Sequence, residues 1–193
     1  MTMTERLANH PTDQALRWWQ PVTQQQTFRK LMNAFSYPGR TQTFADGSVL
    51  GSVLATLVDS EVSLSDPDGQ IDELLSTRLS ARYADNDEAD FIVASGAIDP
   101  EWTPRLGTLS SPEYSATILI KVHSLSEGDG WELTGPGIQD TTRIQVAGLA
   151  PAWLKARHGW CANFPLGVDW ILFSETQLIA LPRTTRIQRL GAH

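Results

Sequence analysis

Cysteine, lysine and long apolar runs are all scarce in this sequence. Its single cysteine, Cys161, excludes an internal disulfide framework. No apolar run approaches the roughly 20 residues that a helix needs to span a bilayer, and residues 1–6 lack the basic and apolar regions of a secretory signal peptide. We therefore expect a cytoplasmic protein. Its 193 residues are enough to bury a core without disulfides or a structural metal.

Positive charge is scarce as well. The chain carries 15 lysine and arginine residues against 22 aspartates and glutamates, which gives a net charge of −7. Nucleic acids and anionic membrane surfaces bind proteins that present a basic patch, so we expect neither as a partner. The three lysines, Lys30, Lys121 and Lys155, do not stand beside a glycine- or serine-rich phosphate loop. A pyridoxal phosphate enzyme needs a lysine in such surroundings, so we expect no cofactor.

Metal and nucleophile signatures are weak. His158 and Cys161 lie three residues apart, but the other histidines, His10, His123 and His193, form no second pair at ligand spacing. No base and orienting partner can be assigned to Cys161 from the sequence, and no serine lies in a Gly-x-Ser-x-Gly elbow. The sequence therefore assigns no catalytic residue and no metal site.

Tryptophan, by contrast, is abundant, with seven residues. Trp18 and Trp19 are adjacent in a polar segment, and neighbouring residues on a helix point about 100° apart. One helix face therefore cannot easily bury both rings, and exposed apolar rings often mark a contact surface. Packing on the chain's own core and packing on a partner are equally open interpretations. We expect residues 1–22 to form an N-terminal arm.

The clearest structural signal lies near the end of the chain. Residues 164–173 and 178–185 are apolar runs separated by a short polar turn, which predicts an antiparallel hairpin. The first run is apolar on both faces, at Val168, Trp170, Ile171, Leu172 and Phe173. Such a strand must be covered on both sides, so we expect it near the centre of a sheet that carries helices.

The remaining pattern alternates helices and strands early and is dominated by strands late. We expect a helix that starts from a capping box at Thr23–Gln26 and ends at Pro38-Gly39. Further helices are predicted at 49–58, at 71–79 with Asp68 as a candidate cap, and at 151–158; strands are predicted at 61–65, 91–94, 116–122, 131–134 and 141–146. The fold class is α/β, a mixed β-sheet with helices on both faces, in a single domain over residues 23–193.

Three segments outside these elements carry expectations of their own. The strands at 116–122 and 131–134 are expected to pair as antiparallel neighbours. Residues 99–114, broken by prolines and a glycine, predict a long irregular connection with room for one helical turn. Residues 186–193 are expected to be a frayed tail.

A glycine-rich turn is the first candidate ligand site. Gly135 and Gly137 flank Pro136, and glycine-rich turns can offer backbone N–H groups to a phosphate. Pro136 removes one donor, however, and neither a P-loop nor a dinucleotide fingerprint is present. A plain tight turn is the favoured interpretation.

The second candidate follows the last predicted strand. Arg183 stands beside the hydroxyls of Thr184 and Thr185, a combination that suits a phosphate or a carboxylate. The favoured alternative is an arginine at a strand end that pairs with an acid such as Asp169 or with a carboxylate of a partner protein. Asp169 itself is an acid within an apolar run, so it is either a catalytic acid or, as we favour, a carboxylate that accepts from backbone N–H groups or an arginine.

Four segments in the same order resemble one known family. They are Phe28-Arg29-Lys30-Leu31-Met32-Asn33-Ala34 through Pro38-Gly39, Leu133-Thr134-Gly135-Pro136-Gly137-Ile138, Phe164-Pro165-Leu166-Gly167-Val168-Asp169, and Ala180-Leu181-Pro182-Arg183-Thr184-Thr185. Together they resemble the PhnH family, the H subunit of the bacterial carbon–phosphorus lyase system for phosphonate use. The resemblance runs from about residue 28 to residue 185.

The resemblance implies a fold like that of pyridoxal-phosphate-dependent transferases, without the cofactor. It also implies work alongside G, I and J subunits, and a homodimer when isolated. In this family the G, H and I subunits, with an accessory L protein, are associated with displacing adenine from MgATP by methylphosphonate. The product is alpha-D-ribose 1-methylphosphonate 5-triphosphate, and the J subunit later cleaves the carbon–phosphorus bond.

Three hypotheses of function are therefore open. The first is a largely non-catalytic subunit of this phosphonate-processing complex. The second is a stand-alone small-molecule transferase or lyase with a site near Asp169 and Arg183. The third is a regulatory or scaffolding module unrelated to phosphonate.

Overall fold

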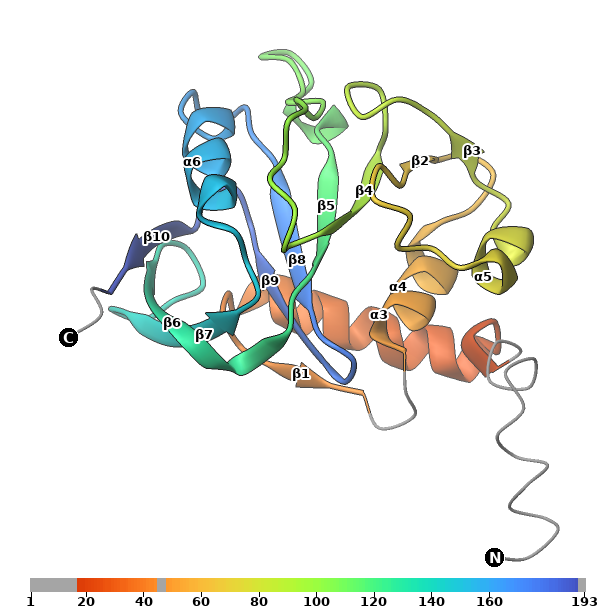
Figure 1. Cartoon of the computed structure of the whole chain (residues 1–193), viewed down its shortest axis with the longest axis horizontal. Coiled ribbons are helices and arrows are strands. Elements are labelled where there is room, and N and C mark those ends of the chain that lie inside the picture. The colour runs from red at the N-terminus through yellow and green to blue at the C-terminus, as the bar shows by residue number, and fades with distance from the viewer. Residues whose placement is uncertain (1–16, 45–47, 191–193) are drawn as a thin grey trace, which may run out of the picture.

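A seven-stranded mixed sheet forms the centre of the computed structural model, which describes residues 17–44 and 48–190 (Figure 1). In spatial order its strands are β1 (Gln42–Thr43), β9 (Gln177–Leu181), β8 (Asp169–Phe173), β5 (Thr117–Lys121), β4 (Phe91–Ser95), β2 (Ser63–Ser65) and β3 (Arg82–Tyr83). The pairs from β8 through to β3 are parallel, whereas β9 runs antiparallel to β8. The predicted mixed sheet, the predicted hairpin and the central position of its first strand are thus confirmed.

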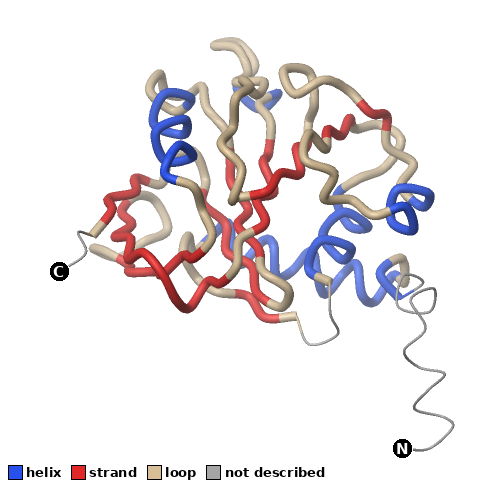
Figure 2. The backbone as a smooth tube through the Cα atoms, in the orientation of Figure 1, coloured by secondary structure: helices blue, strands red, loops and turns tan. Residues whose placement is uncertain are grey.

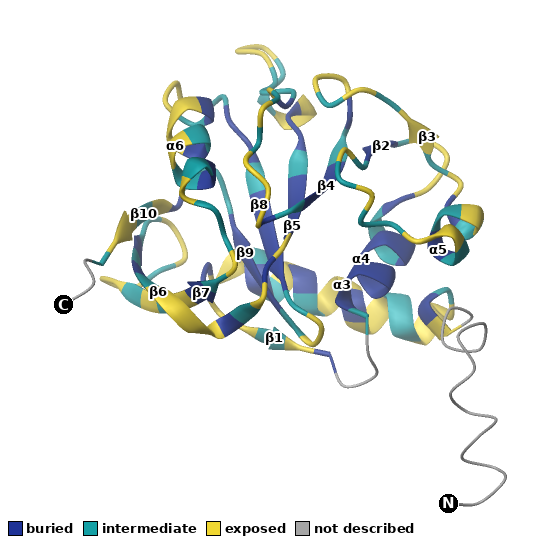
Figure 3. Ribbon diagram, viewed as in Figure 1, coloured by how far each residue is buried: buried dark blue, intermediate teal, exposed yellow. Residues whose placement is uncertain are grey.

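The two faces of this sheet carry different covers. Side chains alternate along β8, so that Ile171 and Phe173 pack into one core while Trp170 and Leu172 pack into the other. The first core is closed by α3 (Pro21–Ser36), α4 (Val49–Leu57) and α5 (Glu73–Arg78). The second is closed by α6 (Pro151–Trp160) and a smaller sheet. Figures 2 and 3 show how these helices flank the strands, whose central residues are buried.

The smaller sheet has three antiparallel strands in the order β10 (Arg186–Arg189), β6 (Ser124–Thr134) and β7 (Thr142–Ala147). The predicted pairing of 116–122 with 131–134 is therefore wrong. β5 is buried on both faces and lies between two parallel strands of the large sheet, so both of its edges are occupied. β6 instead pairs with β7 and β10.

The predicted frayed tail is also wrong over the part that the structure describes. Arg186 stands opposite Thr134 and Arg189 opposite Trp131, so β10 extends the smaller sheet. Its polar composition concealed the strand because only Ile187 turns toward the core. Residues 191–193 lie outside the described residues.

Two predicted helix caps are corrected. α3 begins at Pro21 and has no side-chain cap, so Thr23 lies within the first turn and the capping box does not form. Proline suits this first position because its missing N–H would have had no partner within the helix. α5 is capped by Asp72, whose carboxylate accepts from the Leu75 amide at 2.7 Å. Asp68 instead accepts from an amide at the end of β4.

The remaining helices and the irregular connection follow the prediction closely. α4 and α6 cover the predicted segments, and residues 99–114 hold only a single 3₁₀ turn, η1 (Pro112–Tyr114), among the described elements. Trp18 is 8% exposed and packs on the chain's own core against Gly51 of α4, with Trp19 beside it. Residues 1–16 of the predicted arm lie outside the described residues.

Candidate functional site

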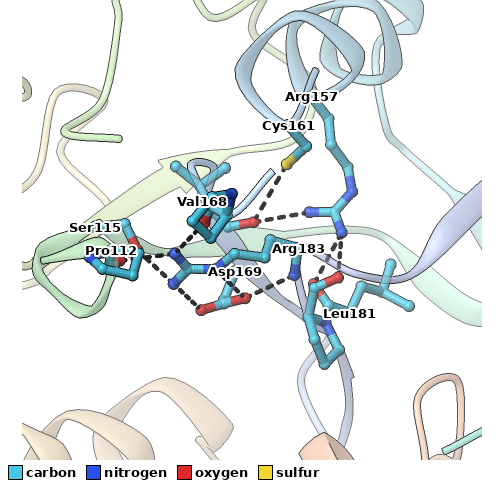
Figure 4. A network of polar contacts seen from close by, with 10 residues as sticks. Pro112, Ser115, Arg157, Cys161, Val168, Asp169, Leu181 and Arg183 are labelled. Carbon is cyan, nitrogen blue, oxygen red and sulfur yellow. Dashed lines mark hydrogen bonds and ion pairs between the residues drawn. The ribbon is translucent and has the colours of Figure 1, made fainter. Parts of the chain in front are cut away.

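An ion pair joins the two strands of the predicted hairpin. Asp169 opens β8, and Arg183 lies two residues after the end of β9. A terminal nitrogen of Arg183 is 2.8 Å from Oδ2 of Asp169, and the Arg183 backbone amide is 2.7 Å from Oδ1 (Figure 4). The predicted pairing of these two residues is therefore observed. Both side chains are largely buried, with exposed fractions of 16% for Arg183 and 21% for Asp169.

The Arg183 guanidinium has no spare donor. Its Nε and one terminal nitrogen donate to Asp169, the second N–H of that nitrogen donates to the Ser115 hydroxyl, and the other terminal nitrogen donates to the carbonyls of Pro112 and Pro165. Since arginine carries five N–H donors, all of them are used within the protein. The geometry thus favours a structural role for this side chain, which ties the irregular connection to β8 and β9.

A second arginine lies deeper and has no acidic partner. Arg157, on the last turn of α6, is 4% exposed and donates to the backbone carbonyls of Val168, Leu181 and Pro182. Its guanidinium also lies 4.8 Å from the centre of the Trp170 ring. Within the described residues, no carboxylate comes within ion-pair distance of it.

The electrostatic surroundings of Arg157 are correspondingly unfavourable. Burial lowers the pKa of its guanidinium, the fields of Cys161 and Asp169 oppose that shift, and the neighbouring Arg183 adds to it. Three carbonyls orient this cation but do not neutralise its charge. The site as a whole therefore holds more positive than negative charge.

Sequence reasoning missed Arg157, although a signal was available. Trp153, Arg157 and Trp160 recur at helical spacing, so they share the buried face of α6. Four tryptophans form one aromatic cluster in which the centres of contacting rings lie 5.7 to 6.3 Å apart: Trp102, Trp153, Trp160 and Trp170. An arginine on the same helix face as two buried tryptophans is expected to be buried with them.

A cavity of about 430 Å³ opens beside these arginines. One side of the cavity is formed by α6 and the two residues that follow it. The other side is formed by the segment that joins β9 to β10 and by the start of β10. Its lining is basic, polar and apolar but contains no acid: Leu154, Arg157, His158, Cys161, Ala162, Arg183, Thr185, Arg186 and Ile187. Thr185 is 4% exposed, and its buried hydroxyl has no hydrogen-bond partner among the described residues. His158 and Cys161 lie on this lining together.

The predicted site residues are only partly brought together. Arg183 and Thr185 line the cavity and Asp169 pairs with Arg183, whereas Thr184 is not on the lining. Gly135 and Gly137 form a tight turn after β6, both with positive φ. A β-carbon at Gly135 would lie 2.8 Å from the Thr184 carbonyl oxygen, so this turn packs closely against the chain after β9.

Comparison with known proteins places the chain in a family. The family model described as bacterial phosphonate metabolism protein (PhnH) matches residues 17–188. The chain belongs to the PhnH family. A Stutzerimonas stutzeri protein named as a C-P lyase subunit, HtxG, is 48% identical over 189 residues, which span 97% of each chain.

A second PhnH relative is more distant. The alpha-D-ribose 1-methylphosphonate 5-triphosphate synthase subunit PhnH of Rhizobium meliloti (strain 1021) is 31% identical over 193 aligned positions, which span 86% of this chain and 90% of the relative. Among the described helices, none combines the length and the apolar character needed to cross a membrane.

Proposed function

We propose that this chain is the H-type subunit of a carbon–phosphorus lyase complex in phosphonate catabolism. In this role it supports formation of alpha-D-ribose 1-methylphosphonate 5-triphosphate from MgATP and methylphosphonate. The observation that carries the proposal is 48% identity, over 97% of both chains, to a relative named as a C-P lyase subunit. The name of the Rhizobium relative supports the same reaction.

The proposed contribution is largely structural. The most conspicuous charged pair, Asp169 with Arg183, is engaged within the protein, which leaves that arginine no donor for a substrate. The proposal includes G, I and J subunits as partners, a homodimer in isolation, a cytoplasmic location and a single domain over residues 23–193. It also includes a fold related to pyridoxal-phosphate-dependent transferases that works without the cofactor.

The alternative is a stand-alone transferase or lyase with its site near Asp169 and Arg183. The basic cavity beside Arg183 favours it, because small-molecule sites are concave and of this size. Substitution of Arg183 by alanine separates the two hypotheses. A stand-alone enzyme would lose activity while its assembly stayed intact, whereas a structural role predicts loss of folding or of assembly.

The direct test is a pull-down of the tagged chain from its host, grown with methylphosphonate as sole phosphorus source. Recovery of the G, I and J companions is the expected result. An Arg189→Gln variant, altered on the exposed strand β10, is the matched control for Arg183→Ala and should recover the same proteins. Recovery of the chain alone, while the companions are expressed, would contradict the proposal.

A further inference from the structure

We infer that the cavity between α6 and the β9–β10 connection binds the anionic head of a small organic phosphate or phosphonate. The inference goes beyond membership of a complex, because it assigns a ligand contact to this chain itself. It rests on three features of the described residues: a buried cation without a counter-charge among them, a buried hydroxyl without a partner among them, and an exposed arginine on the cavity lining that none of them pairs with.

The first feature is Arg157. Its three hydrogen bonds to carbonyls use one donor on one terminal nitrogen and both on the other. Two of its five donors, including Nε–H, therefore have no acceptor within the described residues. A buried charge without a counter-charge is unfavourable, and a bound anion would supply both the missing charge and the missing acceptors.

The second feature is Thr185. Buried hydroxyls in folded proteins almost always have a hydrogen-bond partner, yet this one has none among the described residues. Thr185 lines the same cavity as Arg157. The hydroxyl oxygen itself is covered in the structure, so another part of Thr185 faces the cavity. A rotation about χ1 would turn the hydroxyl toward the cavity, where a phosphate or phosphonate oxygen would accept from it.

The third feature is the contrast among the arginines of β10. Arg189 is paired with Asp129, and Arg143 on β7, at the opposite edge of the smaller sheet, is paired with Glu132. Arg186 is exposed on the cavity lining and has no ion-pair partner in the described part of the chain. Of the two arginines of β10, the one without an ion-pair partner in the described part of the chain is therefore the one on the cavity lining.

The dimensions and the lining narrow the ligand class. A volume of about 430 Å³ exceeds what a lone tetrahedral anion needs and lies in the range of small-molecule sites. Leu154 and Ile187 add apolar surface beside the arginines. An organic body attached to a doubly charged tetrahedral head fits this combination, with Arg157, Thr185 and Arg186 on the head. Arg183 contributes charge there but no hydrogen bond.

The test is isothermal titration of the isolated full chain with inorganic phosphate, methylphosphonate and ribose 5-phosphate, each at the same ionic strength. We expect saturable binding, weakest for inorganic phosphate because it has no organic body to contact the rest of the cavity. The Arg186→Gln variant should weaken binding about fivefold, as expected for loss of one exposed charge-assisted contact. Arg189→Gln, which removes the same charge from the same strand outside the cavity, should leave the affinity within about twofold.

Two results would overturn the inference. One is the absence of saturable binding for all three probes; the other is equal weakening by Arg186→Gln and Arg189→Gln, which would indicate non-specific attraction. Both results are distinguishable from failure of the proposed function, because the pull-down reads out partner proteins and the titration reads out a ligand of the isolated chain.

Thr185 provides an independent check that does not depend on charge. Thr185→Val removes the unpartnered hydroxyl but keeps the shape, so the melting temperature should stay the same or rise. The same variant should weaken binding of ribose 5-phosphate about fivefold, and Thr185→Ser, which retains the hydroxyl, should restore it. Unchanged affinity in Thr185→Val would contradict the assignment of this hydroxyl to the ligand.

Discussion

Two arginine–carboxylate centres stand at the amino ends of parallel strands in the same sheet, and they differ in their charge balance. Asp90 directly precedes β4 and pairs with Arg105, while the Ser63 hydroxyl and amide both donate to the same carboxylate. Asp169 opens β8 and pairs with Arg183. The first centre has one arginine for one acid.

The second centre has an excess of cations. Arg157 and Arg186 line the cavity next to Arg183, and no acid lines it. A balanced pair with satisfied oxygens is sufficient to hold two segments together, as at Asp90. Each centre also has one buried polar atom without a partner among the described residues, Nε of Arg105 in the first and the Thr185 hydroxyl in the second, so the two differ in charge balance and not in this respect. The excess of cations at the second centre is what supports the proposed ligand site there.

The largest effect is expected at Arg157, which has no counterpart in the first centre. Arg157→Met keeps much of the side-chain length but leaves three carbonyls without their donor. We expect a loss of about 3 kcal/mol in the free energy of unfolding, measured by urea denaturation. A variant as stable as the wild type would show that the free-energy cost of burying the cation outweighs the gain from its hydrogen bonds. That result would contradict a stabilising role for Arg157.

The two carboxylates should respond unequally to neutralisation. Asp169→Asn leaves Arg183 and Arg157 without any nearby negative charge, and we expect a loss of about 2 kcal/mol. Asp90→Asn leaves a single, more exposed arginine, and about 1 kcal/mol should be lost. Equal losses in urea denaturation would remove the distinction between the two centres.

Lowering the pH should weaken the contribution of Asp90 to the stability of the fold. Burial raises the pKa of this carboxyl, but hydrogen bonds from Ser63 and Arg105, with the charge of Arg105, outweigh it and leave the pKa below its ordinary value. Because the pKa is lower in the folded protein than in the unfolded chain, ionised Asp90 stabilises the fold at any pH above the unfolded-chain pKa of about 3.9. This stabilisation is lost as the pH falls through the pKa of the folded protein. The stability difference between wild type and Asp90→Asn should therefore shrink from pH 6 to about pH 3; a constant difference would contradict the shift.

The smallest effect is expected at the exposed pair on the smaller sheet. Arg189 and Asp129 are both about half exposed, at 49% and 46%. Exposed pairs contribute little because water and salt screen them. Arg189→Gln should change the free energy of unfolding by less than about 0.5 kcal/mol, and a loss comparable to that of Asp169→Asn would show that burial does not set the ranking.

The sequence carried enough information to find the framework of the second centre. β8 is apolar on both faces, which placed it inside the sheet. Its one acid was expected to accept from backbone N–H groups or from an arginine, and the structure shows both, from the amide and the guanidinium of Arg183. Both features are local in the chain, because the hairpin brings Asp169 and Arg183 together across a short turn. Arg183 and Thr185, the two predicted ligand candidates that line the cavity, come from the same segment.

Features that depend on contacts between residues far apart in the sequence could not be predicted from local patterns. Arg157 reaches its site only because α6 packs over β8 and β9, and the pairing of β6 with β7 and β10 depends on which edges the large sheet leaves free. β10 is polar on its exposed side, so composition alone indicated a tail. Arg186 could not be placed at a cavity mouth until that strand was known.

The most direct measurement is a crystal structure of the full chain soaked with ribose 5-phosphate. We expect tetrahedral electron density within hydrogen-bond distance of Arg157, Thr185 and Arg186, and none at the balanced centre formed by Asp90 and Arg105. An empty cavity at a saturating concentration of the ligand, or density at Arg105 as strong as at Arg186, would contradict the account.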